Sequence, residues 1–491
     1  MISGKRVIAS YAILIISMIL LREYWLFMRQ GLHVDESMSF ILSAYNPYGF
    51  DKAFPDVLKL TGDQLRGAMW FNDVTISGML GDIKSLWVFN RDTPHSNLYY
   101  SLLRIWFTGT SSDKFYFTLL WAVQLNIVLS VASMLIFSHT AYQLSRSHLV
   151  TISSVIVAFI CYETISNTIF ARPYQLQETM TLAFLSMTMA YMRDVVPRTK
   201  FIICYSIVTA FTLLTGYFSV VYVFIVMLMV LIYAIFNCDK NYKDLALTCL
   251  KFALTTSIVA YAIYPPYFFV GGSRQSEALS KSDSLHENML KAVNTLYDLG
   301  TYHPYFWFAF GAFIICVAAS FVWKKADMNK SFILIAVSST IIWWLFVMTF
   351  APYKVPRYVY PALPVLAFVY TTIMIIAGRI HKALGIAVCV AIVSFSIVTY
   401  KAGRVDYSFA NNKPYCNVAL SGETIYFISA PYRLNGLTDC LPDKKVTIVS
   451  NQDQFDKEMS KSGFNHIVSD KPLNGFTKID SYGYFTVYSA R

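Results

Sequence analysis

Charged residues are scarce in this chain of 491 residues, because Asp, Glu, Lys and Arg together make up only 14% of it. A soluble protein carries roughly a quarter of its residues as charged side chains. Hydrophobic residues reach 56%, and the mean hydropathy is +0.48. The shortage of charge excludes an ordinary soluble globular protein and predicts a multi-pass membrane protein.

Motifs of several common enzyme classes are also missing. No glycine-rich phosphate loop follows a predicted strand, and the sequence holds no CxxC or HExxH metal pattern. The 40 basic residues outnumber the 29 acidic ones, but they are dispersed over short loops. This dispersal disfavours a nucleic-acid partner and fits membrane orientation and contact with anionic lipid.

A signal-peptide cleavage site is absent as well. The apolar run over residues 7–28 is too long for a signal peptide and lacks a small-residue motif before Arg29, so we expect it to stay as the first span. In total, about eleven apolar runs come near the roughly 20 residues that cross a bilayer. The other ten lie near residues 115–143, 149–170, 174–192, 201–216, 217–236, 252–270, 304–323, 331–350, 358–378 and 383–400.

The short loops between these runs predict an orientation. With the N-terminus inside, most loop Lys and Arg residues fall on the inner side, among them Lys5, Lys243, Lys251, Lys324 and Lys325. Because inner loops are enriched in Lys and Arg, this asymmetry favours a cytoplasmic N-terminus. An odd number of spans then puts the C-terminus outside.

Two long loops lie outside on this topology. The loop over residues 29–114 holds amphipathic runs, such as 86–89, that suit helices lying in the plane of the interface. The loop over residues 271–303 opens with glycines, and we expect it to be mobile, as an active-site flap is. Both loops belong to a transmembrane domain over residues 1–400.

The tail, residues 401–491, is the third outer region. Alternating runs predict strands, and the stretch 452–461 predicts a short helix. We therefore expect a small α/β domain outside the membrane. Two open alternatives exist for Cys416 and Cys440: two free thiols, or a disulfide closing a loop of about 25 residues worth about 3 kcal/mol in an oxidising compartment.

Polar residues that could take part in catalysis or ligand binding are predicted to lie at this same outer boundary. Asp35 and Glu36 follow the first span, where a carboxylate is costly to desolvate. A base with cations nearby is what group transfer from a lipid phosphate needs. The candidate phosphate ligands are Arg172, Lys354 and Arg357, and the candidate substrate contacts are His95, Tyr174, Tyr353 and Tyr358.

Each of these residues also has a structural interpretation. Acidic residues favour first helical turns, so the acidic pair is consistent with a helix cap. Arg172 and Arg357 are consistent with side chains that reach lipid headgroups. His95 is consistent with a hydrogen-bonded structural histidine, and the tyrosines with an aromatic belt. Their common side of the membrane favours a site, because unrelated structural roles need not converge there.

The order of these motifs resembles that of the GT-C membrane glycosyltransferases. The resemblance rests on the acidic pair after the first span, on residues 93–100 (TPHSNLYY), on residues 171–174 (ARPY) and on Pro356-Arg357-Tyr358 before a proline-bearing helix. It covers residues 1 to about 400. The branch with protein mannosyltransferases and bacterial aminoarabinose transferases is the most similar. Many members read His-Pro-Pro where this chain has Pro94-His95-Ser96, so a role for His95 does not transfer directly.

The resemblance implies a GT-C fold and an inverting transfer of sugar from a polyprenyl phosphate. It makes Asp35 or Glu36 the base that activates the acceptor, with Asp35 favoured and Glu36 orienting groups around it. It also implies that Arg172, Lys354 and Arg357 hold the donor phosphate. Overall size and the single small tail are similar to the serotype-converting O-antigen glucosyltransferases. That subtype implies undecaprenyl-phosphate glucose, lipid-linked O-antigen in lipopolysaccharide, and the periplasmic face of a bacterial inner membrane.

Three other functions fit parts of the sequence. A flippase for lipid-linked sugars predicts polar residues through the midplane of the spans. An O-antigen polymerase predicts a large late outer loop, and a protein O-glycosyltransferase predicts the same chemistry with a polypeptide acceptor. No cofactor is required by any motif. An acidic pair can bind Mg²⁺ or Mn²⁺, but too few further acidic residues accompany it to favour a metal.

Overall fold

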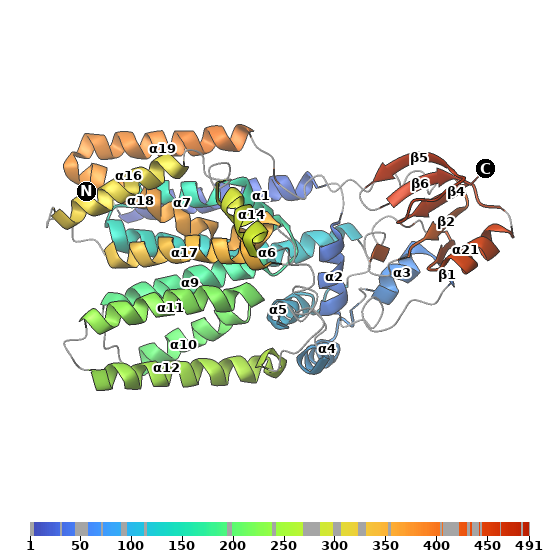
Figure 1. Ribbon diagram of the computed structural model, residues 1–491, viewed down its shortest axis with the longest axis horizontal. Helices are drawn as coiled ribbons and strands as arrows, with labels where there is room; N and C mark the ends of the chain where they lie inside the picture. Colours follow the sequence, from blue (N-terminus) through green and yellow to red (C-terminus); the bar gives the residue numbers. More distant parts are fainter. Residues whose placement is uncertain are drawn as a thin grey trace.

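A bundle of long helices and a mixed β-sheet stand at opposite ends of the computed structural model, with the N-terminus at the end of the bundle far from the sheet (Figure 1). The structure describes the following residues: 4–29, 32–44, 57–69, 72–89, 96–111, 115–193, 199–237, 242–268, 285–297, 306–322, 330–351, 355–402, 405, 422–429, 433–434, 441, 444–461, 463–482 and 485–490.

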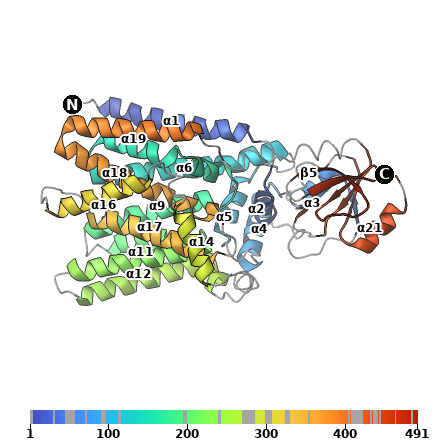
Figure 2. The same ribbon diagram turned by 45° about the horizontal axis from the view of Figure 1, so that its top comes forward.

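The bundle consists of helices that run side by side in both views (Figures 1 and 2). Within the bundle, α6 packs against α9, α10 packs against α12, and α18 packs against both α19 and α7. The helices are α1 (Gly4–Phe27), α6 (Phe115–Ser145), α7 (His148–Phe159), α8 (Tyr162–Ile169), α9 (Tyr174–Arg193), α10 (Thr199–Leu213), α11 (Tyr217–Asn237), α12 (Tyr242–Ile263), α16 (Phe306–Val322), α17 (Lys330–Phe350), α18 (Leu363–Ile380) and α19 (Lys382–Ala402).

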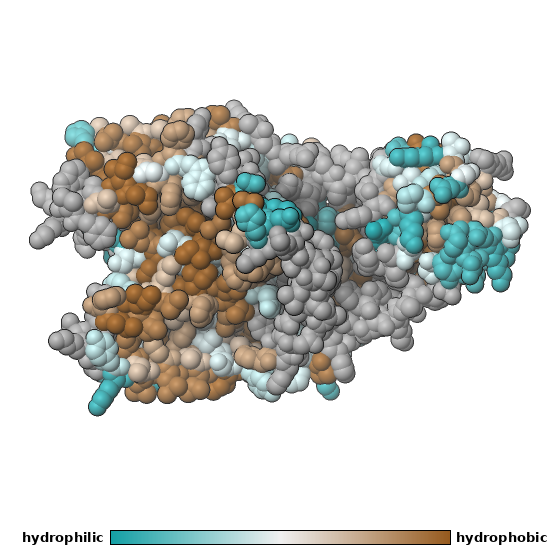
Figure 3. Space-filling model, in the orientation of Figure 1, coloured by the Kyte–Doolittle hydropathy of each residue, from teal (hydrophilic) through white to brown (hydrophobic). Residues whose placement is uncertain are grey.

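Within the described residues, seven helices are long and apolar enough to cross a membrane, or eight when the bent pair α7 and α8 counts as one span. Two shorter apolar helices lie at Thr199–Leu213 and Phe306–Ile315. Each of the eleven predicted runs contains helix, and the chain is a multi-pass helical membrane protein. The number of spans stays a prediction. The hydrophobic surface of the bundle contrasts with the hydrophilic patches of the sheet (Figure 3).

Two predicted boundaries are wrong, and each error has a physical reason. The run at 252–270 is a helix from Tyr242 to Ile263, so Lys243 and Lys251 lie in its first half and not in a loop. Long basic side chains can keep their charge near the interface while the stem lies along apolar surface. The run at 149–170 is not one straight helix, because α7 and α8 meet at an angle of 66°.

Shorter helices lie across the end of the bundle that faces the sheet (Figures 1 and 2). Exposed apolar side chains such as Ile76, Leu80 and Trp87 line α4, as expected for a helix at the interface. These elements are α2 (Val34–Ser43), α3 (Gly62–Met69), α4 (Ile76–Phe89), α5 (Leu98–Trp106) and α14 (Leu285–Tyr297), with 3₁₀ turns η1 (Pro265–Phe268), η2 (Pro356–Tyr358) and η3 (Tyr360–Ala362).

The sheet has six strands in the order β1-β3-β2-β4-β6-β5, and α21 (Gln452–Met459) follows β3. Strands β2, β3 and β4 are parallel, whereas β1 pairs antiparallel with β3, and β6 pairs antiparallel with both β4 and β5. Their bounds are β1 (Val57–Leu60), β2 (Thr424–Phe427), β3 (Val446–Val449), β4 (His466–Ser469), β5 (Thr477–Tyr482) and β6 (Phe485–Ser489). The strands predicted near 424–428, 445–449 and 484–488 correspond to β2, β3 and β6, whereas β1, β4 and β5 are not predicted.

One face of the sheet shares a hydrophobic core with the crossing helices. Tyr426, Ile448 and Val487 belong to the same buried cluster as Phe40 and Ile41 of α2. Burying this apolar surface stabilises the arrangement at roughly 25 cal/mol per Å². The helix that carries the acidic pair is therefore packed between the bundle and the sheet. Cys416, Cys440 and the predicted flap residues 271–284 and 298–303 lie outside the described residues.

Candidate active site

The acidic pair lies in the first turn of α2. His33 is the N-cap, in an extended conformation with φ −78° and ψ 143°. Its Nδ1 accepts the backbone N–H of Asp35 at 3.1 Å, and Oε2 of Glu36 accepts the backbone N–H of His33 at 3.0 Å. This reciprocal capping box satisfies two N–H groups that a helix start leaves open. The structural interpretation of the pair as a cap therefore holds for Glu36.

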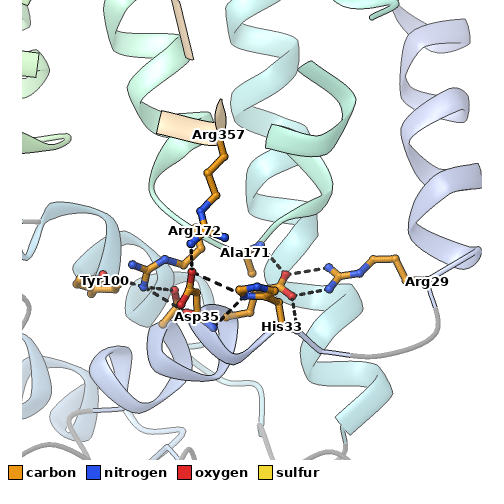
Figure 4. A network of polar contacts seen from close by, with 9 residues as sticks. Arg29, His33, Asp35, Tyr100, Ala171, Arg172 and Arg357 are labelled. Atoms are coloured by element: carbon orange, nitrogen blue, oxygen red, sulfur yellow. Dashed lines mark hydrogen bonds and ion pairs between the residues drawn. The ribbon is translucent and has the colours of Figure 1, made fainter. Parts of the chain in front are cut away.

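Glu36 is sealed inside the protein. Its side chain is 0% exposed, and both terminal guanidinium nitrogens of Arg29 donate hydrogen bonds to it. Nη1 of Arg29 lies 2.8 Å from Oε1, and Nη2 bonds Oε2. Oε1 also accepts the backbone N–H of Ala171 at 2.8 Å. A carboxylate paired with an arginine and two backbone N–H groups is satisfied without solvent. Glu36 thus joins the end of α1, the start of α2 and the turn before α9 (Figure 4).

Asp35 points to the other side of the helix and stays accessible. Its side chain is 22% exposed, and Oδ2 accepts a hydrogen bond from Arg357 Nη2 at 2.7 Å. Nδ1 of His33 lies 3.7 Å from the same oxygen. Arg357 is itself 17% exposed, so this ion pair borders solvent. Of the two carboxylates, Asp35 is the one that is accessible to solvent.

Arg172 supports the helix that carries Asp35. Its Nη1 donates to the backbone oxygen of Asp35 at 3.2 Å and to the hydroxyl of Tyr100 at 3.2 Å. A third, longer contact reaches Ser39 Oγ at 3.4 Å. The side chain is almost fully buried. Arg172 and Arg357 therefore approach Asp35 from two elements, the turn before α9 and η2, as Figure 4 shows.

Aromatic rings form the wall beside Arg357. The guanidinium carbon lies 5.9 Å from the ring centres of both Phe170 and Tyr358, within the range of cation–π attraction. Tyr174 stacks on Phe170 and approaches Tyr358, with ring centres 6.1 and 6.4 Å apart. These contacts restrict the position of the guanidinium.

His33 is the remaining titratable group at the site. Burial lowers the pKa of its imidazole below the ordinary value, and Arg357 and Arg172 lower it further, whereas Asp35 and Glu36 oppose the shift. A neutral ring is also what the cap requires, since Nδ1 must accept the N–H of Asp35. The site thus holds a neutral imidazole beside an accessible carboxylate.

The structure brings together six of the predicted site residues: Asp35, Glu36, Arg172, Tyr174, Arg357 and Tyr358. The other three, His95, Tyr353 and Lys354, lie outside the described residues. Sequence reasoning missed Arg29, His33 and Tyr100. Arg29 had a signal, because a basic residue at the outer end of the first span runs against the expected charge asymmetry.

The arrangement can serve as an anion site next to a base. The guanidinium of Arg357 pairs with the accessible carboxylate of Asp35, and that of Arg172 contacts the backbone oxygen of the same residue. An arriving phosphate would compete with Asp35 for Arg357. Among the described residues, no three His, Cys, Asp or Glu side chains gather as metal ligands. The described residues themselves offer one accessible carboxylate and two guanidinium groups.

Solved structures of two membrane enzymes share this fold. ArnT from Cupriavidus metallidurans, in a crystal structure bound to undecaprenyl phosphate, aligns with a TM-score of 0.54 and 11% identity over 98% of both chains. The apo structure of the same enzyme aligns with a TM-score of 0.52 and 12% identity, again over 98% of both chains. The apo oligosaccharyltransferase from Archaeoglobus fulgidus gives 0.52 and 11% identity over 95% of this chain and 70% of its own.

A search of curated proteins found no match. The sequence profile of the Alg9-like mannosyltransferase family, however, matches residues 90–434, well over half of the chain. This profile and the shared fold agree with the GT-C superfamily. The chain therefore belongs to the Alg9-like mannosyltransferase family and is a glycosyltransferase.

Proposed function

We propose that this protein is an inverting glycosyltransferase that takes a sugar from a polyprenyl phosphate at the outer face of the membrane. One observation carries the proposal: the accessible carboxylate of Asp35 lies 2.7 Å from Arg357, at the end of the bundle where amphipathic helices cross. A base and an anion site at a membrane boundary suit a donor with an apolar tail and a phosphate head. The undecaprenyl phosphate bound to the similar ArnT structure supports the same donor class.

The donor phosphate would take the place of Asp35 as the partner of Arg357. A guanidinium offers paired donors that match phosphate oxygens, and the aromatic wall of Phe170 and Tyr358 keeps it in position. Arg172 would add a second positive charge from the turn before α9. Lys354, which lies outside the described residues, is a further proposed ligand. Release of Asp35 from its ion pair would then free the carboxylate for the acceptor.

Asp35 is the proposed base. It takes the proton of an acceptor hydroxyl while the acceptor oxygen bonds to the anomeric carbon on the face opposite the phosphate. The bond from the anomeric carbon to the phosphate oxygen breaks, and its electron pair stays on that oxygen. Polyprenyl phosphate leaves with one more negative charge than the diester had, which Arg357 and Arg172 compensate. A single displacement of this kind inverts the anomeric configuration.

Glu36 does not take the proton in this scheme, because it is fully buried and ion-paired with Arg29. Its role is to fix the start of α2 and so the direction of Asp35. Tyr174 and Tyr358, which lie beside Arg357, are proposed contacts of the sugar or its phosphate. His95 and Tyr353, which lie outside the described residues, are two further proposed contacts.

The finer part of the proposal concerns the substrates. We propose undecaprenyl-phosphate glucose as donor and lipid-linked O-antigen as acceptor, with the N-terminus in the cytoplasm and the sheet in the periplasm. The support is the motif order together with the chain's size and single small tail. The transferred glucose would branch the O-antigen and change the serotype.

The test compares cells with and without the gene. Mass spectrometry of lipopolysaccharide should show one added hexose per repeat unit, and purified enzyme should release undecaprenyl phosphate from its glucose derivative. An inactive variant, D35N, controls for effects of the protein's mere presence in the membrane. An unchanged glycan with a newly modified protein would favour a polypeptide acceptor. Donor movement across the bilayer that persists in D35N would favour a flippase.

A further inference from the structure

A chain of buried polar side chains runs through the bundle below the active site. Arg22 of α1 and Glu178 of α9 are both fully buried, in a part of the protein made of apolar helices. Ionisable groups at such depth are costly and are retained when they serve a specific purpose. The reaction described above involves neither residue and does not account for them.

Arg22 spans the break between α7 and α8. Its Nη2 donates to the backbone oxygen of Phe159, the last residue of α7, at 3.2 Å. Its Nε donates to Thr168 Oγ1 in α8 at 3.1 Å. A break in a membrane helix leaves carbonyl groups without helical partners, and side chains from neighbouring helices must satisfy them. Arg22 thus stabilises the 66° bend and ties both halves to α1.

The chain continues from α8 to α9. The hydroxyl of Thr168 donates to Gln175 Oε1 at 2.8 Å, and Gln175 Nε2 donates to Glu178 Oε1 at 2.9 Å. Asn167 Nδ2 reaches the other carboxylate oxygen at 3.3 Å. The single hydroxyl proton of Thr168 is shared between Gln175 and the carbonyl of Thr164, which lies 3.0 Å away. Hydrogen bonds thus link Arg22 to Glu178 without a gap.

The short helix held in this way leads directly into the active site. The carbonyl of Ile169 accepts from Arg29 at 2.6 Å, and that of Phe170 accepts from Asn126 at 2.7 Å. The next two residues supply the N–H that binds Glu36 and the guanidinium that contacts Asp35. The turn over residues 169–172 is therefore held on its N-terminal side by α8 and at Ala171 by the hydrogen bond to Glu36 of the capping box.

We propose that Arg22 and Glu178 are positioning residues that act through Thr168 and α8 to place Ala171 and Arg172 at the active site. The bridging hydroxyl and amide link the two buried ionisable groups and give the polar chain a fixed geometry. The functional consequence rests on the proposed donor site: a displaced turn would misplace Arg172 relative to the donor phosphate. Small misplacements of this kind lower reaction rates on the order of ten- to a hundredfold.

The chain offers a closely matched pair of variants for the test. Thr168 bonds the carbonyl four residues earlier at 3.0 Å and a side chain of another helix at 2.8 Å. Thr371 of α18 does the same, at 3.0 Å to Ala367 and 2.8 Å to Ser154. Both hydroxyls are fully buried, but only Thr168 belongs to the polar chain. T168V removes the hydroxyl that links Arg22 to Gln175 but keeps the side chains of Arg22 and Glu178. T371V removes an equivalent buried hydroxyl that is not part of the polar chain.

The experiment uses the full-length protein in lipid nanodiscs, with two readouts. In T168V we expect roughly tenfold weaker binding of undecaprenyl phosphate and a similar rise in the donor KM, and less than about twofold change in T371V. Hydrogen exchange should be faster at the Ala171 amide in T168V and unchanged there in T371V. E178Q should change the same amide, provided that it folds.

Equal behaviour of T168V and T371V in both readouts would overturn the proposal, and so would faster exchange at Ala171 with unchanged donor affinity. The proposed function fails in a different way. If the unmodified protein neither binds undecaprenyl phosphate nor turns over its sugar derivative, the donor assignment is wrong. The exchange measurement would then still decide whether Arg22, Thr168 and Glu178 position the turn.

Discussion

The two sides of the first turn of α2 differ both in exposure to solvent and in the arginine that each binds. On one side Glu36 is 0% exposed and bound by Arg29, and on the other Asp35 is 22% exposed and bound by Arg357. Successive residues of an α-helix point about 100° apart, so adjacent carboxylates need not share an environment. One carboxylate is enclosed by the protein, and the other borders solvent.

This difference shows how one short motif can serve structure and chemistry together. The enclosed side fixes the helix against the end of α1 and the turn at Ala171. On the exposed side, the direction of the Asp35 carboxylate is set by the way in which Glu36 fixes the helix. Changing either side alone should therefore separate the structural role from the chemical one.

Replacing Asp35 by Asn should have the largest effect. The amide keeps the shape but cannot accept the acceptor's proton, and loss of a general base lowers rates about 10²- to 10⁴-fold. We expect kcat to fall by about 10³ with unchanged thermal unfolding. Asp73→Asn, an exposed aspartate of the same outer loop, is the control. Turnover in D35N within about twofold of the unmodified enzyme would rule out Asp35 as the base.

Replacing Glu36 by Gln should act on stability first. It leaves the guanidinium of Arg29 buried without a counter-charge, which costs about 3 kcal/mol or more. Thermal unfolding in detergent measures the loss. D63N breaks a comparable pair with Arg66, but Asp63 is 68% exposed, so less than about 1 kcal/mol should be lost. Equal losses in the two variants would contradict the assignment of Glu36 to the enclosed side.

Replacing Arg357 by Lys should weaken donor binding with little change in stability. Lysine keeps the charge but loses the planar donors and the stacking against Phe170 and Tyr358. We expect the donor KM to rise about tenfold, equivalent to about 1.4 kcal/mol. R193K, at the far end of α9 where Arg193 bonds Gln143, should leave the donor KM unchanged. A rise in the acceptor KM alone would place Arg357 at the acceptor instead.

The smallest effect concerns pH. Burial holds the pKa of His33 below its ordinary value of about 6.5, so the unfolded chain binds its proton first. The stability contributed by the neutral ring is fully present above pH 6.5 and is lost as pH falls from there through the lowered pKa. Unfolding measured at pH 7.5 and 5.5 should show this loss. H33N keeps a side-chain acceptor for the cap and should show a smaller difference between the two pH values.

Most of the helical fold could be predicted from the sequence because membrane spans need only length and apolar composition. Residues 149–170 show the limit of that reasoning. The break after Phe159 has no proline or glycine within it, and the partner that stabilises it, Arg22, lies 137 positions away. Strand β1 was missed for a similar reason, since four residues acquire their strand character only by pairing with β3.

The candidate site was predictable as a set of residues but not as a division of roles. Charge and position near the ends of spans identified Asp35, Glu36, Arg172 and Arg357. Which carboxylate faces solvent depends on Arg29 and on the backbone N–H of Ala171, and neither contact leaves a local pattern in the sequence. Side-chain partners from distant segments decide such questions.

The pairing of β1 with β3 also imposes an order on biosynthesis. The ribosome makes Val57–Leu60 early, but the partner strand Val446–Val449 appears about 390 residues later, which takes roughly 20 to 80 s at typical rates of synthesis. Until then the segment lacks the strand with which it pairs, and the bundle helices from α6 to α19 are made in the interval. Closure of the sheet is therefore a late assembly event that joins an early and a late part of the nascent chain.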